Sequence, residues 1–209
     1  MNVLDQFLAS PVAAVIFIIT LITSLQAFRD PQLMYKFILN PYDIVRNKEY
    51  YRMFTSGLIH GNTTHLAVNM ISYYFFAFAL ERILGHWQFA VLYVGSLFLS
   101  DITTLIKHKD NPAYNALGAS GAVSAVLLSV VMCMPDLTLL LFFVIPMPGW
   151  FFAIAYIGYS YWASKNSNDN IGHEAHLWGA ISGIVLTLIL KPDVVFILQD
   201  WILGIVYGR

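Results

Sequence analysis

Three short clusters of chemically capable side chains lie at or near the start of long apolar segments. They are residues 60–69 (HGNTTHLAVN), 118–121 (GASG) and 175–179 (AHLWG). Polar groups at membrane depth are costly and mark functional sites by default. Ser120 supplies a hydroxyl nucleophile, and His176 supplies an imidazole that can act as its base. The clusters therefore favour peptide hydrolysis by an activated serine inside a membrane.

The first cluster offers two side-chain donors on one helical face. His65 and Asn69 are four residues apart, so they point the same way one turn apart. Both can donate hydrogen bonds to the oxyanion of a tetrahedral intermediate. Polar residues also join helices inside membrane bundles, and the pair alone does not separate the two roles. His60, five residues earlier, is expected to brace the connecting loop.

The glycines around Ser120 have two interpretations. Small residues in membrane helices often serve only close packing. However, the segment 118–121 opens a predicted helix, where free backbone N–H groups and the positive end of the helix dipole can stabilise negative charge. Flanking glycines also let a substrate backbone approach. The motif by itself leaves both interpretations open, and the helix start would place backbone donors beside Ser120.

His176 is followed by Gly179 and Gly183, which form a G-x-x-x-G face suited to close helix packing. If that face meets the helix of Ser120, the imidazole comes near the hydroxyl. His173 is the rival base, although it lies nearer the polar loop.

Four other residues have simpler interpretations. Asp101 could orient a histidine, but a local hydrogen bond near the end of its span fits better. Glu81 and Arg82 are interpreted as a charged helix end with an internal pairing. The single cysteine, Cys133, lies in an apolar segment and is expected to be a buried, unreactive thiol.

The composition predicts a polytopic membrane protein. The 209 residues are 58% hydrophobic and only 11% charged, whereas about 25% is typical of soluble domains. A net charge of −1 without a basic cluster argues against nucleic acid as a partner, and the apolar composition makes membrane lipid an expected one. One cysteine excludes a disulfide framework. The first apolar segment lacks a basic flank and a cleavage site, so it is expected to stay as a span.

Six membrane-spanning helices are expected, each of roughly 20 residues. Their approximate bounds are 11–28, 65–80, 89–106, 117–134, 150–162 and 174–190. The connection from Arg29 to about Thr64 mixes aromatic and charged residues, which is typical of a partly structured interfacial segment. Residues 137–145 are too short to cross. The tail from Val194 to Tyr207 is expected to be an interfacial or re-entrant helix, with a seventh crossing left open.

Together these motifs resemble the rhomboid family of intramembrane serine proteases. The match consists of H-x-x-x-x-H-x-x-x-N on a second helix, G-x-S-G opening a fourth, and A-H-x-x-G-x-x-x-G on a sixth. The resemblance implies an all-α six-helix bundle with a long first loop, as one membrane domain over 1–209 with its core at about 51–190 and a tail at 191–209.

The resemblance also implies a mechanism. Ser120 would attack the scissile carbonyl and His176 would carry the proton, without a third acidic member and without a metal or cofactor. His65, Asn69 and the backbone N–H of Ser120 would form the oxyanion hole, and His60 and Arg52 would brace the first loop. The substrates would be single-pass transmembrane proteins.

Two positions depart from the family pattern. Trp-Arg is frequent in the family's first loop, where this chain has Tyr51-Arg52. Many members carry a tyrosine one turn after the nucleophile, which stacks on the catalytic imidazole; here that position is Ser124. The ring of His176 must therefore be held from elsewhere.

The sequence leaves alternatives open for the orientation of the protein in the membrane and for its function. Most Lys and Arg residues follow the odd-numbered spans, which would place those loops in the cytoplasm, whereas the resemblance places the mouth of the site outside. A bacterial cytoplasmic membrane is the expected location. A catalytically silent relative that binds and escorts transmembrane helices is the second hypothesis. A zinc peptidase or metal transporter using His60, His65, His173, Glu174 and His176 is the third, although the spacing is not H-E-x-x-H.

Overall fold

The computed structural model describes residues 2–141, 144–167, 169 and 171–208 of the chain. Eleven α-helices, one 3₁₀ turn and a two-stranded hairpin are found in these ranges. Parts of two predicted loops, Phe142 with Phe143 and Asn168 with Asn170, lie outside the described residues.

Six helices coincide with the six predicted apolar segments. They are α2 (Pro11–Ala27), α6 (Thr63–Leu84), α7 (His86–His108), α8 (Ser120–Cys133), α9 (Gly149–Asn166) and α10 (His173–Leu190). Within the described chain, only α6, α7 and α10 are long and apolar enough to cross a membrane on their own, and α1 (Val3–Ala9) with α2 makes a fourth if the bent pair counts as one span. The six-crossing count therefore stays a prediction.

The long first connection is folded, as predicted. It contains α3 (Pro31–Phe37), α4 (Pro41–Arg46), α5 (Arg52–Thr55) and the 3₁₀ turn η1 (Ser56–Leu58). The buried guanidinium of Arg52 donates to the carbonyls of Tyr35 and Ile38 at 2.6 and 2.9 Å and also pairs with Glu49. One side chain thus fastens α3 to α5, which confirms the predicted bracing role of Arg52.

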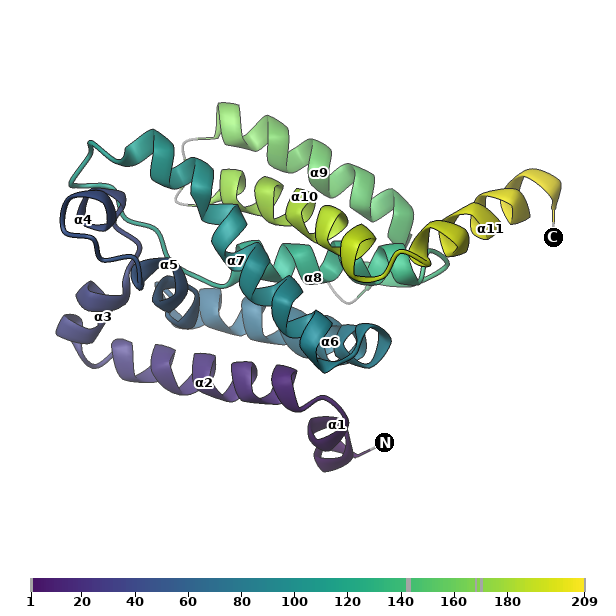
Figure 1. The fold of residues 1–209 in the computed structure, drawn as a ribbon, viewed down its shortest axis with the longest axis horizontal. Helices are drawn as coiled ribbons and strands as arrows, with labels where there is room; N and C mark the ends of the chain where they lie inside the picture. Colours follow the sequence, from purple (N-terminus) through teal and green to yellow (C-terminus); the bar gives the residue numbers. More distant parts are fainter. Residues whose placement is uncertain (1, 142–143, 168, 170, 209) are drawn as a thin grey trace.

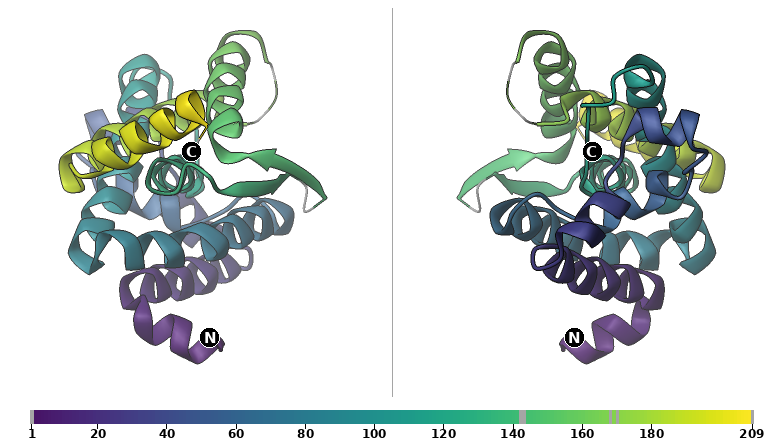
Figure 2. Two further views of the ribbon diagram at one scale, coloured as in Figure 1. Left: turned by 90° about the vertical axis from the view of Figure 1, so that its right-hand side faces the viewer. Right: turned by 90° about the vertical axis from the view of Figure 1, so that its left-hand side faces the viewer.

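The all-helical prediction needs a correction between α8 and α9. Here β1 (Thr138–Leu141) pairs antiparallel with β2 (Ile145–Pro148), and Leu141 lies opposite Ile145. Pro146 and Pro148 lack the N–H that a helix would need, so the segment extends and forms a hairpin instead. Figure 2 shows this hairpin projecting from the side of the bundle.

The interpretation of Glu81 as one half of a pair with Arg82 is wrong. Its buried carboxylate accepts hydrogen bonds from the N–H groups of Val12 and Ala13, at 3.1 and 2.6 Å, and from His86 Nδ1 at 2.6 Å. These N–H groups belong to the first turn of α2, where no backbone acceptor exists. Glu81 therefore caps α2 from α6.

The central helix is α8, which lies end-on in the middle of the bundle in Figure 2 and is surrounded by α6, α7 and α10. Eleven of its fourteen residues are buried, the exceptions being Ser120, Leu127 and Met132. The helices α9 and α2 lie on opposite outer sides (Figure 1). At the C-terminus, α11 (Val194–Tyr207) extends away from the bundle in Figure 1 and carries exposed Phe196, Ile202 and Tyr207, while its interfacial or re-entrant placement stays a prediction.

Candidate functional site

Ser120 is the first residue of the central helix, as predicted. The chain reaches it through Gly118, which has φ of +111° and donates its N–H to the carbonyl of Ser56 at 2.9 Å. This positive φ strains any residue with a Cβ, so glycine is required at the entry to α8. No side chain of the described residues caps the helix, and the first-turn N–H groups beside Ser120 are therefore free to bind a ligand.

One close approach between α8 and α10 lies beside Ser120 and His176. A Cβ on Gly179 would come 2.7 and 2.8 Å from the backbone C and Cα of Gly121, and one on Gly121 would come 3.3 Å from the carbonyl oxygen of Ala175. Ser120 precedes Gly121, and His176 follows Ala175. The two predicted catalytic residues therefore flank one backbone contact.

The side chains of Ser120 and His176 are both partly exposed, so neither is sealed in the core. Across the described part of the chain, no hydrogen bond joins the hydroxyl of Ser120 to the imidazole of His176. Such bonds are often long or poorly aligned without substrate. The structure thus brings the two residues to adjacent turns of touching helices, and the bond itself stays a prediction.

His65 lies against the loop that enters the central helix. Its ring atoms Cε1 and Nε2 are 2.7 and 2.8 Å from where a Cβ on Gly118 would be. Asn69 is buried on the same helix, and its side-chain nitrogen donates to the carbonyl of His65 at 3.1 Å. One amide hydrogen of Asn69 remains available. His65 is therefore close to Ser120 in the fold, while no described contact joins Asn69 to Ser120.

His60 braces the loop against α2. The hydroxyl of Ser24 donates to the carbonyl of Leu58 at 3.0 Å, so His60 Nδ1 must donate to Ser24 Oγ at 3.0 Å. The ring then packs edge-on against His65 with centroids 4.9 Å apart. Burial lowers the pKa of His60 to about 3, and the neighbouring His65 adds to this effect. His60 is therefore a neutral structural residue at pH 7.

Aromatic neighbours hold the ring of His176, and this set was not found from the sequence. The ring of Tyr156 on α9 stacks on it with centroids 6.4 Å apart and planes at 28°, while His173 meets it edge-on at 6.1 Å. The only sequence signal at Tyr156 was an aromatic residue within an apolar helix. Periodicity does not specify which neighbour such a residue contacts.

The rival base is engaged elsewhere. His173 is buried, and its Nε2 lies 3.1 Å from the carboxylate of Asp169 in the preceding loop. Hydrogen bonds from His173 and from the backbone of Ile171 lower the pKa of the Asp169 carboxyl. His173 therefore links the loop to α10, and in the described residues it has no contact with Ser120.

The remaining candidates lie outside the site. Asp101 has no histidine as a hydrogen-bond partner in the described chain and lies near Tyr114. Cys133 is free and buried, as expected. Within the described ranges, no three His, Cys, Asp or Glu side chains converge as metal ligands, and Glu174 pairs with Lys107 at 3.1 Å.

Comparison with known proteins identifies relatives of this chain. The family profile described as the Rhomboid domain matches residues 47–193. RHOMBOID-like protein 12, mitochondrial, of Arabidopsis thaliana is 29% identical over 170 residues, which make up 74% of this chain and 50% of the plant protein. The chain thus spans about half the length of that relative.

Two further relatives differ in what their names say about activity. The Bacillus subtilis protein named Putative rhomboid protease YdcA is 32% identical over 158 residues, 69% of each chain. Inactive rhomboid protein 1 of Drosophila melanogaster is 31% identical over 83 residues, 40% of this chain and 6% of the fly protein.

Proposed function

Because the chain belongs to the rhomboid family, we propose that it is an intramembrane serine endopeptidase, which cleaves single-pass transmembrane proteins in or near their membrane segment through a dyad of Ser120 and His176. The observation that carries the proposal is the contact of Gly121 with Gly179 and the Ala175 carbonyl. It sets a hydroxyl and an imidazole on facing turns of two helices at a partly exposed position.

The reaction follows the logic of a serine triad without the acid. The hydroxyl of Ser120 attacks the scissile carbonyl carbon, and His176 takes the proton. The resulting oxyanion accepts hydrogen bonds from the free N–H of Ser120, from His65 and from the second amide hydrogen of Asn69. His176 then protonates the departing amine, the C–N bond breaks, and a water deprotonated by His176 hydrolyses the acyl ester.

Placement of the base within a membrane bundle favours a membrane-embedded substrate. The helices that carry the site are apolar enough to span a bilayer or lie against one that does. A soluble peptide would have to enter lipid, whereas a transmembrane helix is already there. The proposed location is an integral, multi-pass position in a membrane, with a bacterial cytoplasmic membrane as the first choice.

The test uses purified protein in liposomes with a single-pass transmembrane substrate and a serine-directed fluorophosphonate. Wild type should cut the substrate and be labelled, and Ser120→Ala and His176→Ala should lose both activities. Ser164→Ala, an exposed α9 serine whose hydroxyl donates only to the Tyr161 carbonyl, should behave as wild type. Cleavage that survives in Ser120→Ala would disprove the dyad. A wild type that binds the substrate but neither cuts nor labels would identify a silent escort.

A further inference from the structure

Tyr156 combines two contacts that single it out on α9. Its ring stacks on His176 and also stacks with Phe152, with centroids 5.6 Å apart and planes at 21°. Its hydroxyl lies 2.5 Å from the hydroxyl of Ser124 on α8. One side chain thus contacts the proposed base with its face and the helix of the proposed nucleophile with its tip.

The direction of the hydroxyl contacts follows from counting protons. Ser124 Oγ also lies 2.7 Å from the carbonyl oxygen of Ser120, which can only accept. The single hydroxyl proton of Ser124 is therefore donated to the Ser120 carbonyl, so the Tyr156 hydroxyl must donate to Ser124 Oγ. The result is a directed chain from the Tyr156 hydroxyl through Ser124 to the main chain of Ser120.

The helix that carries Tyr156 is loosely attached. Only Gly149, Ser160 and Ala163 of its eighteen residues are buried. A Cβ added at Gly158 would meet nothing within 4 Å. The bond to Ser124 therefore ties a peripheral helix to the second turn of the central one. Exposed Trp150 and Trp162 lie near the two ends of the helix, a pattern typical of a helix whose outer face meets lipid.

We propose that Tyr156 is the positioning residue for His176 and that Ser124 latches it in place, so that the catalytic base is aligned only while α9 is docked on α8. This inference rests on the proposed function. The rings of Tyr156 and His173 both pack against the imidazole, which limits its rotation. Movement of α9 away from α8 would remove the Tyr156 ring from His176, and the imidazole would no longer be aligned for proton transfer.

The small side chain at position 124 is part of this arrangement. Ser124 is buried beneath the tyrosine hydroxyl. A large aromatic residue there would occupy the space of the Tyr156 hydroxyl. The positioning ring can therefore come from α8 or from α9, but not from both at once.

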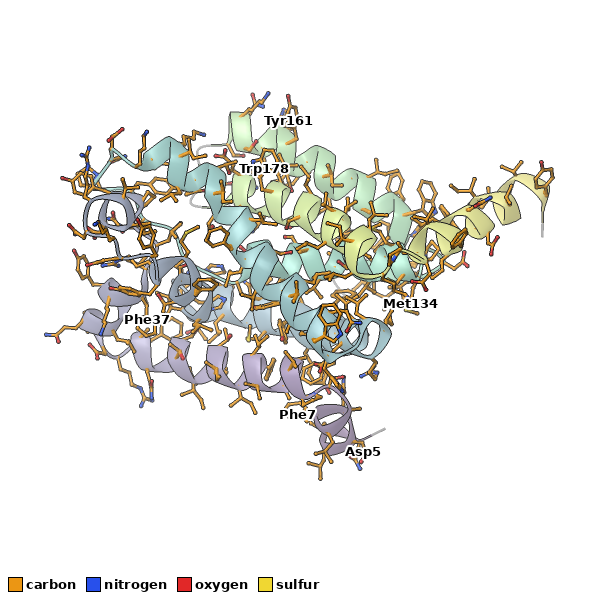
Figure 3. The ribbon with its side chains drawn as sticks, in the orientation of Figure 1. Asp5, Phe7, Phe37, Met134, Tyr161 and Trp178 are labelled. Atoms are coloured by element: carbon orange, nitrogen blue, oxygen red, sulfur yellow. The ribbon has the colours of Figure 1, made fainter. Side chains whose placement is uncertain are left out.

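The experiment measures kcat and KM on a reconstituted transmembrane substrate, with fluorophosphonate labelling rates, for five variants. They are Tyr156→Ala, Tyr156→Phe, Ser124→Ala, the double variant Tyr156→Phe with Ser124→Ala, and Ser124→Tyr combined with Tyr156→Ala. Tyr161→Phe is the matched control. Tyr161 is on the same helix and projects outward (Figure 3), and its substitution removes only a hydrogen bond that Lys165 donates. Thermal unfolding in detergent checks that each variant is folded.

Loss of alignment of the His176 ring should lower kcat and leave substrate binding, as judged by KM, nearly unchanged. We expect Tyr156→Ala to reduce kcat by about 10- to 100-fold with KM changed by less than about threefold, as misplacement of a catalytic group does. Tyr156→Phe and Ser124→Ala should each cost about threefold to tenfold, and the double variant no more than either, because both remove the same bond between Tyr156 and Ser124. Ser124→Tyr should recover part of the loss in Tyr156→Ala.

The outcomes separate the two proposals. A wild type that neither cuts nor labels overturns the proposed function and, with it, this inference. An active wild type whose Tyr156→Ala variant matches Tyr161→Phe in kcat overturns only the positioning role. Additive losses in the double variant overturn the latch. A Tyr156→Phe variant with the kcat of wild type, beside an Ala variant that does not fold, would reduce Tyr156 to a packing residue.

Discussion

Two contacts of the central helix differ in kind. Where α8 meets α10, backbone lies on backbone, and a Cβ on Gly183 would come 2.5 Å from the Cα of Ala125. Where α8 meets α9, a tyrosine reaches across to a serine hydroxyl. The first contact fixes how far the main chains of Ser120 and His176 are apart. The second sets how one ring is turned.

The backbone contact and the side-chain contact therefore have different roles in the bundle. Glycine-to-backbone packing has one tight arrangement and little freedom to shift. A side chain on a peripheral helix can leave and return. The outer helix α2 is attached in the second way, through Glu81 and through the bond between Ser24 and His60. The bundle thus has a rigid centre, α8 with α10, and two flanks, α2 and α9, which are attached by side-chain hydrogen bonds.

The largest effect is expected when the rigid contact is broken. Gly179→Ala would put a methyl group 2.7 Å from the backbone of Gly121, and we expect a loss of about 3 kcal/mol or failure to fold, as for a severe overpacking substitution. Gly158→Ala on α9 is the matched control, since its Cβ meets open space, and should stay within about 1 kcal/mol of wild type. Unfolding in detergent measures both, and equal shifts would contradict the comparison.

The flank at α2 should respond less strongly. Glu81→Gln removes one of the two acceptors that cap α2 and the pairing with His86, and we expect a loss of about 2 kcal/mol, typical of hydrogen bonds to a charged group. Activity per folded molecule should be unchanged, because Glu81 does not contact the site. Arg82→Gln, at an exposed neighbour, controls for loss of charge. A Glu81→Gln protein as stable as wild type would show that α2 does not depend on this cap.

His60 should make the flank sensitive to acid. An unfolded imidazole binds a proton below about pH 6.5, whereas in the folded protein the pKa is about 3. Between these values the unfolded state binds more protons, so stability falls as pH is lowered, by up to about 1.4 kcal/mol per pH unit. His60→Gln should flatten this slope in unfolding measured from pH 7 to 5. Parallel curves for the two proteins would remove His60 as the cause.

The smallest effect is expected from the polar pair inside the rigid contact. Thr187 Oγ1 lies 2.7 Å from Ser129 Oγ between α10 and α8. Thr187→Val keeps the shape and removes the hydroxyl, and should cost only about 0.6 kcal/mol, as membrane-buried hydrogen bonds do on average. Detergent unfolding beside Gly179→Ala gives the comparison. A larger loss in Thr187→Val than in Gly179→Ala would show that hydrogen bonding, not steric fit, holds the centre.

Local patterns in the sequence predicted the helices well and the contacts between them poorly. The apolar runs located all six long helices, since hydrophobic length is a local property. The hairpin was missed because nine apolar residues fit several structures, although Pro146 and Pro148 argued against a helix. The role of Glu81 was misjudged because its partners, Val12 and Ala13, lie almost seventy residues away.

The sequence by itself determined that this is a membrane protein, that Ser120 opens a helix, and that glycines three and seven residues after His176 can admit a close neighbour. These properties depend on composition and short spacing. Only the tertiary structure decided that the neighbour is α8, that His173 is bound to Asp169, and that the ring on His176 comes from α9. These contacts depend on how the helices pack. The periodicity of a sequence predicts on which side of its helix a residue lies, but not which other residue it contacts there.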